Sequence, residues 1–370
     1  MKNYDFIVVG AGLFGAVFAQ QAHEAGRSVL VLERRRHLGG NCHTYEYEDT
    51  GITVHSYGTH IFHTSDERIW KYMCRFTEFN RHQHRVLTTW RDRVFSMPIN
   101  LGTINAFFGL HLRPDQAEAF LASKREPIPN PRNLEEKAVS LVGRELYDAF
   151  VKGYTMKQWG CDPKLLPANI ITRLPVRTSY HDAYFNDLHQ GVPVEGYTRI
   201  FERMLEGIPH ELGVDFLADR AHWRSRARRI VYTGPIDRYF AHAAGHLSWR
   251  SERFELERLP VSDHQGVSVM NYADPDVPFT RIHEPKHLHL ERPWNPDATV
   301  IMREYSQVDP DEPYYPVNFE SDKVMLAEYQ RLATAEPDVI FGGRLASYKY
   351  FDMHQVVGQA LARAREVLAA

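Results

Sequence analysis

The chain has 370 residues, with 44 basic against 47 acidic side chains and a net charge of −3. This length suits about two to three domains. The balanced charge carries no footprint of nucleic-acid or anionic-membrane binding, and no apolar run approaches membrane-spanning length. Cys42, Cys74 and Cys161 form no disulfide or zinc motif, so we expect a reduced, cytoplasmic protein. A first strand from residue 4 also predicts that no signal peptide is present.

The N-terminal segment predicts a dinucleotide site. A strand over residues 4–9 leads directly into Gly-x-Gly-x-x-Gly, and a helix is predicted over 16–25. Gly10 permits the tight turn, Gly12 lets the backbone approach a pyrophosphate, and Gly15 lets the helix pack closely. The helix N-terminus supplies N–H donors and a positive dipole end.

Features beyond this motif favour FAD over NAD. A second strand over 28–32 ends at Glu33, whose carboxylate suits ribose hydroxyls and disfavours a 2′-phosphate. The Gly39-Gly40 pair then brings bare backbone near the cofactor again. A strand with Gly-Gly-Arg at 340–345, before a helix over 353–368, would place a second helix N-terminus and an arginine there.

The middle of the chain predicts a helical insertion. Apolar residues recur at helical spacing from 103 to 144, and the prolines within 126–131 divide this region into two helices. Asn133 is the expected N-cap of the second helix, with Glu136 as its capping-box partner.

The later part of the chain predicts an antiparallel sheet, because 254–257, 267–270 and 299–305 alternate apolar and polar residues. The expected fold is an α/β Rossmann-like FAD-binding domain interrupted by a helical-bundle subdomain and this β-sheet subdomain. The predicted ranges are 1–66, 190–240 and 318–370 for the FAD-binding domain, 101–178 for the helical subdomain, and 67–100, 179–189 and 241–317 for the sheet subdomain.

The 20 histidines raise the question of a metal site. His-x-His pairs could each supply two ligands, but the sequence has no His-Glu-x-x-His motif and no carboxylate–histidine cluster. We therefore predict no bound metal.

Six further segments combine aromatic, basic and glycine residues in a distinctive order. They span 57–64, 150–159, 169–177, 271–284, 300–305 and 342–353. Together they resemble the flavin-dependent UDP-galactopyranose mutases of the bacterial type, and the resemblance extends over nearly the whole chain.

The resemblance implies an isomerase that interconverts UDP-galactopyranose and UDP-galactofuranose with no net redox change. FAD is implied in its reduced state, with flavin N5 as the nucleophile on the anomeric carbon and UDP as the leaving group. It also implies UDP-galactose as substrate, an external reductant such as NAD(P)H or a reductase, and a homodimer.

The resemblance further implies the roles of individual residues. Arg173 and Arg281 would clamp the diphosphate, because a guanidinium presents a rigid fork of donors to phosphate oxygens. Arg173 lies in the segment that would close over substrate, and His60 would act on the flavin side. The implied substrate-binding residues are Phe150, Tyr154, Thr155, Trp159, Tyr184, Asn271, Glu304, Tyr315 and Tyr350. The cofactor-binding residues expected from the glycine motifs and the resemblance are Gly10, Gly12, Phe14, Gly15, Glu33, Arg34, Gly40, Asn41, His60, Gly343, Arg344, Tyr350, Asp352 and Met353.

Thr59, Thr178 and Ala346 depart from the family pattern, which leaves room for a related substrate. UDP-N-acetylgalactosamine or a dTDP-hexose is the first alternative. An FAD oxidoreductase of the amine-oxidase type and a catalytically silent FAD-binding module are the others.

Overall fold

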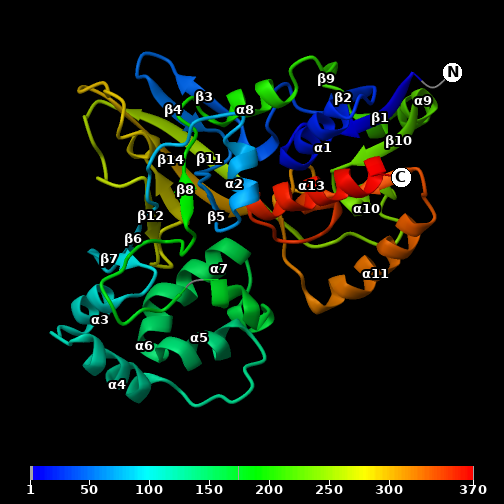
Figure 1. Ribbon diagram of the computed structural model, residues 1–370. Helices are drawn as coiled ribbons and strands as arrows, with labels where there is room; N and C mark the ends of the chain where they lie inside the picture. Colours follow the sequence, from blue (N-terminus) through cyan, green and yellow to red (C-terminus); the bar gives the residue numbers. More distant parts are fainter. Residues whose placement is uncertain (1–2, 174, 370) are drawn as a thin grey trace.

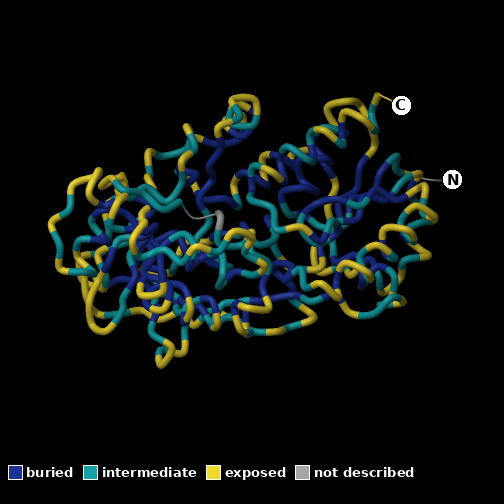
Figure 2. The backbone as a smooth tube through the Cα atoms, turned by 90° about the horizontal axis from the view of Figure 1, so that it is seen from below, coloured by how far each residue is buried: buried dark blue, intermediate teal, exposed yellow. Residues whose placement is uncertain are grey.

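The structure is a computed structural model that describes residues 3–173 and 175–369, with the side chains of Thr172 and Arg173 outside the description. Two large sheets, two small two-stranded sheets (β3 with β4 and β5 with β8, bounds below) and a group of helices form the described part of the molecule (Figure 1). Figure 2 shows buried backbone near the two ends of the chain, where the first sheet lies, and a second buried region in the other half of the molecule.

The first sheet is parallel throughout and has five strands. Their spatial order is β16 (Val339–Phe341), β10 (Ala227–Tyr232), β1 (Tyr4–Val9), β2 (Val29–Glu33) and β9 (His210–Leu212). Parallel strands are buried on both faces, so they need cover on each side. Helices α1 (Leu13–Glu24) and α13 (Met353–Ala369) pack together over one face (Figure 1). Side chains from α9 (Arg220–Arg226), α10 (Ile236–Tyr239) and α12 (Gly343–Ala346) join the core of the other face.

The second sheet has seven strands. Their order is β15 (Tyr315–Pro316), β11 (Trp249–Leu259), β14 (Thr299–Gln307), β13 (Arg281–His283), β12 (Val269–Tyr272), β6 (Val86–Trp90) and β7 (Arg93–Met97). The expected antiparallel pairing holds for each neighbouring pair except β12 with β6, which is parallel. No hairpin joins these two strands, because the helical region and much of the parallel sheet lie between them in the chain.

The helical region follows β7. Its helices are α3 (Leu101–Phe108), α4 (Pro114–Lys124), α5 (Leu134–Val142), α6 (Arg144–Leu146), a π-helical turn (Tyr147–Lys152) and α7 (Gly153–Trp159). The predicted cap of α5 is present, because the Asn133 side chain accepts the Glu136 N–H at 2.9 Å. The Glu136 side chain accepts the N–H of Arg132, one residue before the expected partner.

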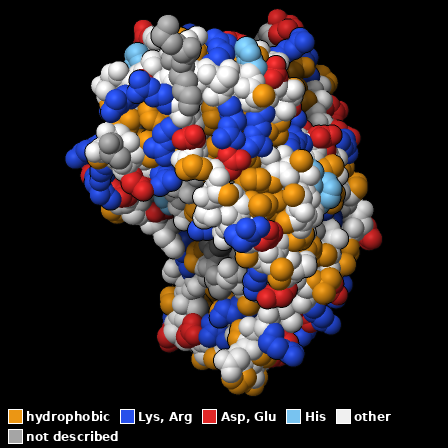
Figure 3. All heavy atoms as spheres, turned by 90° about the vertical axis from the view of Figure 1, so that its right-hand side faces the viewer, with side chains coloured by type: hydrophobic (Ala, Val, Ile, Leu, Met, Phe, Trp, Pro, Cys, Tyr) orange, Lys and Arg blue, Asp and Glu red, His pale blue; other side chains and the backbone are white. Residues whose placement is uncertain are grey.

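The remaining elements connect these parts. They are β3 (Thr44–Tyr47), β4 (Ile52–His55), β5 (Phe62–Thr64), α2 (Glu67–Met73), β8 (His189–Gly191), α8 (Tyr197–Met204), α11 (Glu320–Thr334) and 3₁₀ turns at Gly40–Cys42, Pro163–Leu165, Ala168–Arg173, Phe216–Asp219 and Pro285–Leu288. Across the described residues, no helix combines the length and apolar character needed to cross a bilayer. Basic and acidic side chains are interspersed on the face shown in Figure 3.

Candidate active site

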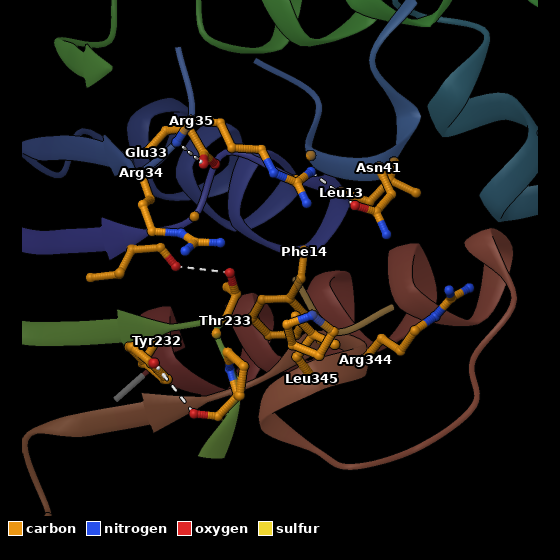
Figure 4. A pocket seen from close by; sticks show the side chains of 18 of the residues that line it. Leu13, Phe14, Glu33, Arg34, Arg35, Asn41, Tyr232, Thr233, Arg344 and Leu345 are labelled. Atoms are coloured by element: carbon orange, nitrogen blue, oxygen red, sulfur yellow. Dashed lines mark hydrogen bonds between the residues drawn. The ribbon is translucent and has the colours of Figure 1, made fainter. Parts of the chain in front are cut away.

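A pocket opens where β1 and β2 end and α1 begins. Figure 4 shows Glu33, Arg34 and Arg35 on one side of this pocket and Leu345 and Arg344 on the other. The predicted cofactor residues in its lining are Gly10, Gly12, Phe14, Glu33, Arg34, Gly40, Asn41, His60, Gly343, Arg344 and Met353. The lining omits Gly15, Tyr350 and Asp352. The structure thus brings residues from both ends of the chain to one hollow.

At each of the three glycines of the opening motif, a side chain would meet different surroundings. Gly10 has φ +104°, and a Cβ there would lie 2.1 Å from Thr233 Oγ1. A Cβ on Gly15 would lie 1.9 Å from the Gly10 carbonyl oxygen, so this position requires glycine for helix–strand packing. A Cβ on Gly12 would meet nothing closer than Gly40 Cα at 3.9 Å, and φ at Gly12 is an ordinary −79°. The chain itself therefore tolerates a side chain at Gly12, and the space beside it fits a closely approaching ligand.

Glu33 supports the local turn as well as facing the pocket. Its Oε2 accepts the Ala11 N–H and its Oε1 accepts the Arg35 N–H, each at 2.8 Å. A carboxylate can accept about four hydrogen bonds, so two acceptor positions remain for ribose hydroxyls.

A salt bridge from the β14–β15 connection crosses the pocket wall. Glu312 pairs with Arg34 and with Arg35, each at 2.5 Å. Arg35 also lies 4.3 Å from the ring centroid of Tyr57 and donates to Asn41 Oδ1 at 2.9 Å. Sequence reasoning missed Arg35 and Glu312, because partners 277 residues apart leave no local pattern.

Two other lining residues, Arg344 and His60, are held by backbone carbonyls. Arg344 donates to the Phe351 carbonyl oxygen at 2.6 and 3.1 Å. His60 Nδ1 lies 2.8 Å from the Gly58 carbonyl oxygen. Burial lowers the pKa of His60 to about 4, so this imidazole is neutral at pH 7.

A second group of polar side chains lies on one face of the mixed sheet. Arg281 stands directly opposite Asn271 on β12 and opposite Glu304 on β14, so all three project to the same side. Arg281 Nε lies 3.0 Å from Glu304 Oε1. His283 Nε2 lies 2.9 Å from Glu304 Oε2, and its other ring nitrogen lies 2.8 Å from the hydroxyl of Thr59.

This arrangement decides the ionisation of Glu304. Burial raises its pKa, but the charge of Arg281 and the hydrogen bond from His283 outweigh burial and hold the pKa at about 2. The charge of Glu304 in turn keeps the pKa of Arg281 well above its usual value. Arg281 and Glu304 are therefore an ionised pair at neutral pH.

Aromatic side chains extend this face. Tyr315 lies between Trp159 and Tyr350, with ring centroids 5.4 and 5.2 Å away. The Tyr154 hydroxyl accepts a hydrogen bond from the Arg281 guanidinium. The structure thus assembles these four predicted aromatic residues beside the Arg281–Glu304 pair.

Other predicted substrate residues have different surroundings. Phe150 is buried and packs edge-on against Phe95 and Phe107, with centroids 4.9 and 5.4 Å apart. Thr155 is also buried, and Tyr184 packs against His84. The side chain of Arg173, at the end of a 3₁₀ turn, lies outside the described residues.

Two further side chains support the site. Lys157 Nζ donates to the carbonyl oxygens of Tyr272, Asp274, Val277 and Phe279, at 2.7, 2.9, 3.0 and 3.1 Å. The Tyr315 hydroxyl lies 2.8 Å from Glu252 Oε1. The motif at 150–159 contains Lys157 but does not reveal that its ammonium ties α7 to the β12–β13 connection.

Two groups of potential metal ligands occur within the described residues. In the group that contains Asp263 and Glu284, Lys286 Nζ lies 3.1 Å from Asp263 and 3.5 Å from Glu284. The Lys286 ammonium thus supplies the positive charge that a cation would bring. In the other, His63 Nδ1 lies 2.6 Å from Asp187.

Comparison with known proteins identifies the family. The family model for UDP-galactopyranose mutase matches residues 149–350, and the model for an NAD(P)-binding Rossmann-like domain matches residues 8–76. A probable UDP-galactopyranose mutase of Klebsiella pneumoniae is 41% identical over 100% of this chain and 96% of its own length. A dTDP-fucopyranose mutase of Escherichia coli is 36% identical over 96% of each protein.

A solved structure of reduced UDP-galactopyranose mutase has the same fold, with a TM-score of 0.77, 14% sequence identity, and coverage of 99% of this chain and 96% of that one. The fold expected from the sequence, a Rossmann-like domain combined with a second sheet, is confirmed. On this family model and these full-length relatives, the chain belongs to the UDP-galactopyranose mutase family.

Proposed function

We propose that this protein interconverts UDP-galactopyranose and UDP-galactofuranose. The observation that carries the proposal is the ionised Arg281–Glu304 pair, set among tyrosines on one face of the mixed sheet. The side chain of Arg281 is 26% exposed, so its guanidinium is fixed on one side and reachable from the other. A nucleotide diphosphate is the anion that this fork of donors suits.

The cofactor that we propose for the glycine-lined pocket is FAD. The open space at Gly12, the free acceptor positions of Glu33 and the start of α1 fit a dinucleotide. When bound and reduced, FAD would supply a nucleophilic nitrogen for attack on the anomeric carbon. His60 and Arg344, both in the pocket lining, would lie at its inner end.

The chain's own residues would hold the leaving group in place. Arg281 forms an ion pair with Glu304 on its Nε side, where the N–H is not aligned for a hydrogen bond, and donates from one terminal nitrogen to Tyr154, which leaves further N–H donors for the diphosphate. Fixed donors stabilise charge as it develops on the departing UDP without rearranging during the reaction. Glu304 acts as a positioning residue, because it sets the orientation of the guanidinium.

Several finer assignments belong to the same proposal and derive from the family resemblance. Arg173 would provide the second guanidinium, on a segment that closes over substrate. An external reductant such as NAD(P)H or a reductase, a homodimer and a cytoplasmic location complete this part. We also propose the division into FAD-binding, helical and sheet ranges given above.

A second candidate is the same chemistry on another nucleotide sugar. The similarity to a dTDP-fucopyranose mutase, 36% over 96% of each chain, supports this alternative.

One experiment tests both candidates. The purified protein, reduced with dithionite, is offered UDP-galactose, UDP-N-acetylgalactosamine and dTDP-hexoses in parallel, and the products are separated by chromatography. We expect UDP-galactofuranose from the reduced protein and almost none from the oxidised protein. Equal conversion in the oxidised state contradicts the nucleophilic role of the cofactor, and conversion of a dTDP-hexose alone favours the second candidate. Reduction of the flavin by the sugar itself would indicate an oxidoreductase.

A further inference from the structure

The carboxyl group of Glu252 lies beside Tyr315. The two residues belong to the paired strands β11 and β15. The Tyr315 hydroxyl lies 2.8 Å from Glu252 Oε1. The second oxygen, Oε2, is buried and has no hydrogen-bond partner among the described residues. An ionised carboxylate would leave a charged oxygen buried without a donor, which is costly, so this geometry favours the protonated acid.

The charges around Glu252 favour the same state. The titratable groups that face it are Glu304, Arg281, Arg250, Tyr154, Tyr314 and Tyr315. The two cations are already engaged, Arg281 by Glu304 and Arg250 by the Gln158 carbonyl oxygen and the Ser306 hydroxyl. Burial, followed by the charge of Glu304, raises the pKa of Glu252 to about 8. Of the two acidic groups, Glu304 is therefore ionised at pH 7 and Glu252 is protonated.

The protonation state of Glu252 sets the direction of its bond with Tyr315. A tyrosine hydroxyl has one hydrogen to donate. An ionised Glu252 can only accept, so it takes that hydrogen. A protonated Glu252 can donate to the hydroxyl oxygen, and the hydrogen of Tyr315 is then free for another acceptor.

We propose that Glu252 is a positioning residue: in its protonated form it donates to Tyr315 and directs the Tyr315 hydroxyl hydrogen toward the diphosphate of the nucleotide sugar. This inference rests on the proposed function and on the family resemblance, which implies that the Tyr315 hydroxyl bonds the diphosphate. Loss of the Glu252 proton reverses the bond and withdraws one donor from the substrate.

Binding of UDP-galactose to the oxidised, FAD-loaded protein tests this role without turnover. Titration calorimetry is performed from about pH 6 to pH 9, a range in which the esterified diphosphate does not titrate. For the wild-type protein we expect Kd to rise about tenfold from pH 7 to pH 9, as expected for the loss of one hydrogen bond to a charged group. Glu252→Gln, which stays neutral and keeps an N–H donor, should bind at pH 9 as tightly as at pH 7.

The Tyr315→Phe variant shows whether the pH dependence of Kd comes from the direction of the Glu252–Tyr315 hydrogen bond or from repulsion between ionised Glu252 and the diphosphate. At pH 9, Glu252→Gln should tighten binding about tenfold in the wild-type background, but should give no gain where Tyr315 is phenylalanine. Glu255→Gln is the matched control, because exposed Glu255 lies on the same strand and accepts the hydroxyl of Tyr305 at 2.8 Å. It should leave binding at both pH values unchanged.

Three results overturn the inference. These are a pH-independent wild-type Kd, an alkaline rise that persists in Glu252→Gln, and an equal gain from Glu252→Gln in the Tyr315→Phe background. Failure of the wild-type protein to bind UDP-galactose at pH 7 overturns the proposed function and this inference with it. Infrared spectroscopy adds a readout independent of binding: at pH 7 the carbonyl band of a protonated carboxyl should be present in the wild-type protein and absent from Glu252→Gln.

Discussion

Arg281 and Glu304 stand directly opposite each other on neighbouring strands, and their side chains meet with Nε and Oε1 3.0 Å apart. The strand register therefore fixes the position of the Arg281 charge on this face of the sheet. Its orientation does not depend on a loop, because both residues belong to regular strands.

Replacing Arg281 with alanine should remove most turnover while FAD stays bound. Losing a charge-assisted donor set to the diphosphate should reduce kcat/KM by about a hundredfold or more. Steady-state kinetics of the reduced variant measure this effect. Arg303→Ala is the control, because Arg303 lies on the same strand pair but bonds Glu257 at the surface. Near-normal turnover in Arg281→Ala would contradict the role proposed for this guanidinium.

The two glycines Gly12 and Gly15 should fail in different ways when substituted. Gly12→Val should fold but lose FAD, because the protein leaves room at this position and the ligand would not. Gly15→Ala should reduce stability or prevent folding, because its Cβ would lie 1.9 Å from a carbonyl oxygen. Flavin absorbance of the purified variants and thermal unfolding of their apo forms distinguish the two outcomes. A Gly12→Val protein that retains FAD stoichiometrically would contradict the assigned pocket.

Lys157→Met should loosen the connection between β12 and β13. Four carbonyl oxygens lose their common ammonium donor, which should lower the free energy of unfolding by about 2–3 kcal/mol. Hydrogen exchange should quicken in residues 272–281, and the free energy of unfolding in urea should fall. Lys152→Met, five residues earlier and exposed, provides the control. Unchanged exchange in 272–281 would show that the ammonium does not hold this connection.

Acid should weaken the fold through its buried histidines. Burial lowers the pKa of His82 to about 4, below the usual 6.5, so the unfolded chain takes up this proton first as the pH falls. The stability that depends on a neutral His82 is complete above pH 6.5 and is lost as the pH falls toward 4. We therefore expect the free energy of unfolding of His82→Gln, relative to that of the wild type, to rise by about 2 kcal/mol as the pH falls from 7 to 4.5. Urea unfolding at the two pH values measures this difference, and exposed His111→Gln should show none.

The sequence predicted the start of the parallel sheet and one helix of the helical region well because their signals are local. The Gly-x-Gly-x-x-Gly motif, the strand ending in Glu33 and the Asn133 cap each depend on residues close together in the chain. The structure has β2 and α5 where these signals predict them. The parallel pairing of β12 with β6 could not be predicted, because it joins segments about 180 residues apart.

The site shows the same division between local and distant information. Arg281 and Glu304 follow from motifs, whereas Glu252 lies on a strand of alternating charged residues that resembles an ordinary surface strand. Only the fold shows that Glu252 faces Tyr315, while exposed Glu255 faces Tyr305. Glu312 is hidden from sequence reasoning for a similar reason, because its two arginine partners lie at the opposite end of the chain.

The strand order of the parallel sheet also has a consequence for synthesis. β16 is one of its two edge strands, and α13 packs on α1 from the far end of the sequence. During translation, the first βαβ unit therefore waits for partners encoded more than 300 residues later. At about 5–20 residues per second, this delay is roughly 15–70 s. The face of α1 that α13 covers therefore stays uncovered for that time, and the dinucleotide pocket gains its last lining residues, Met353 and Val356, only at the end of synthesis.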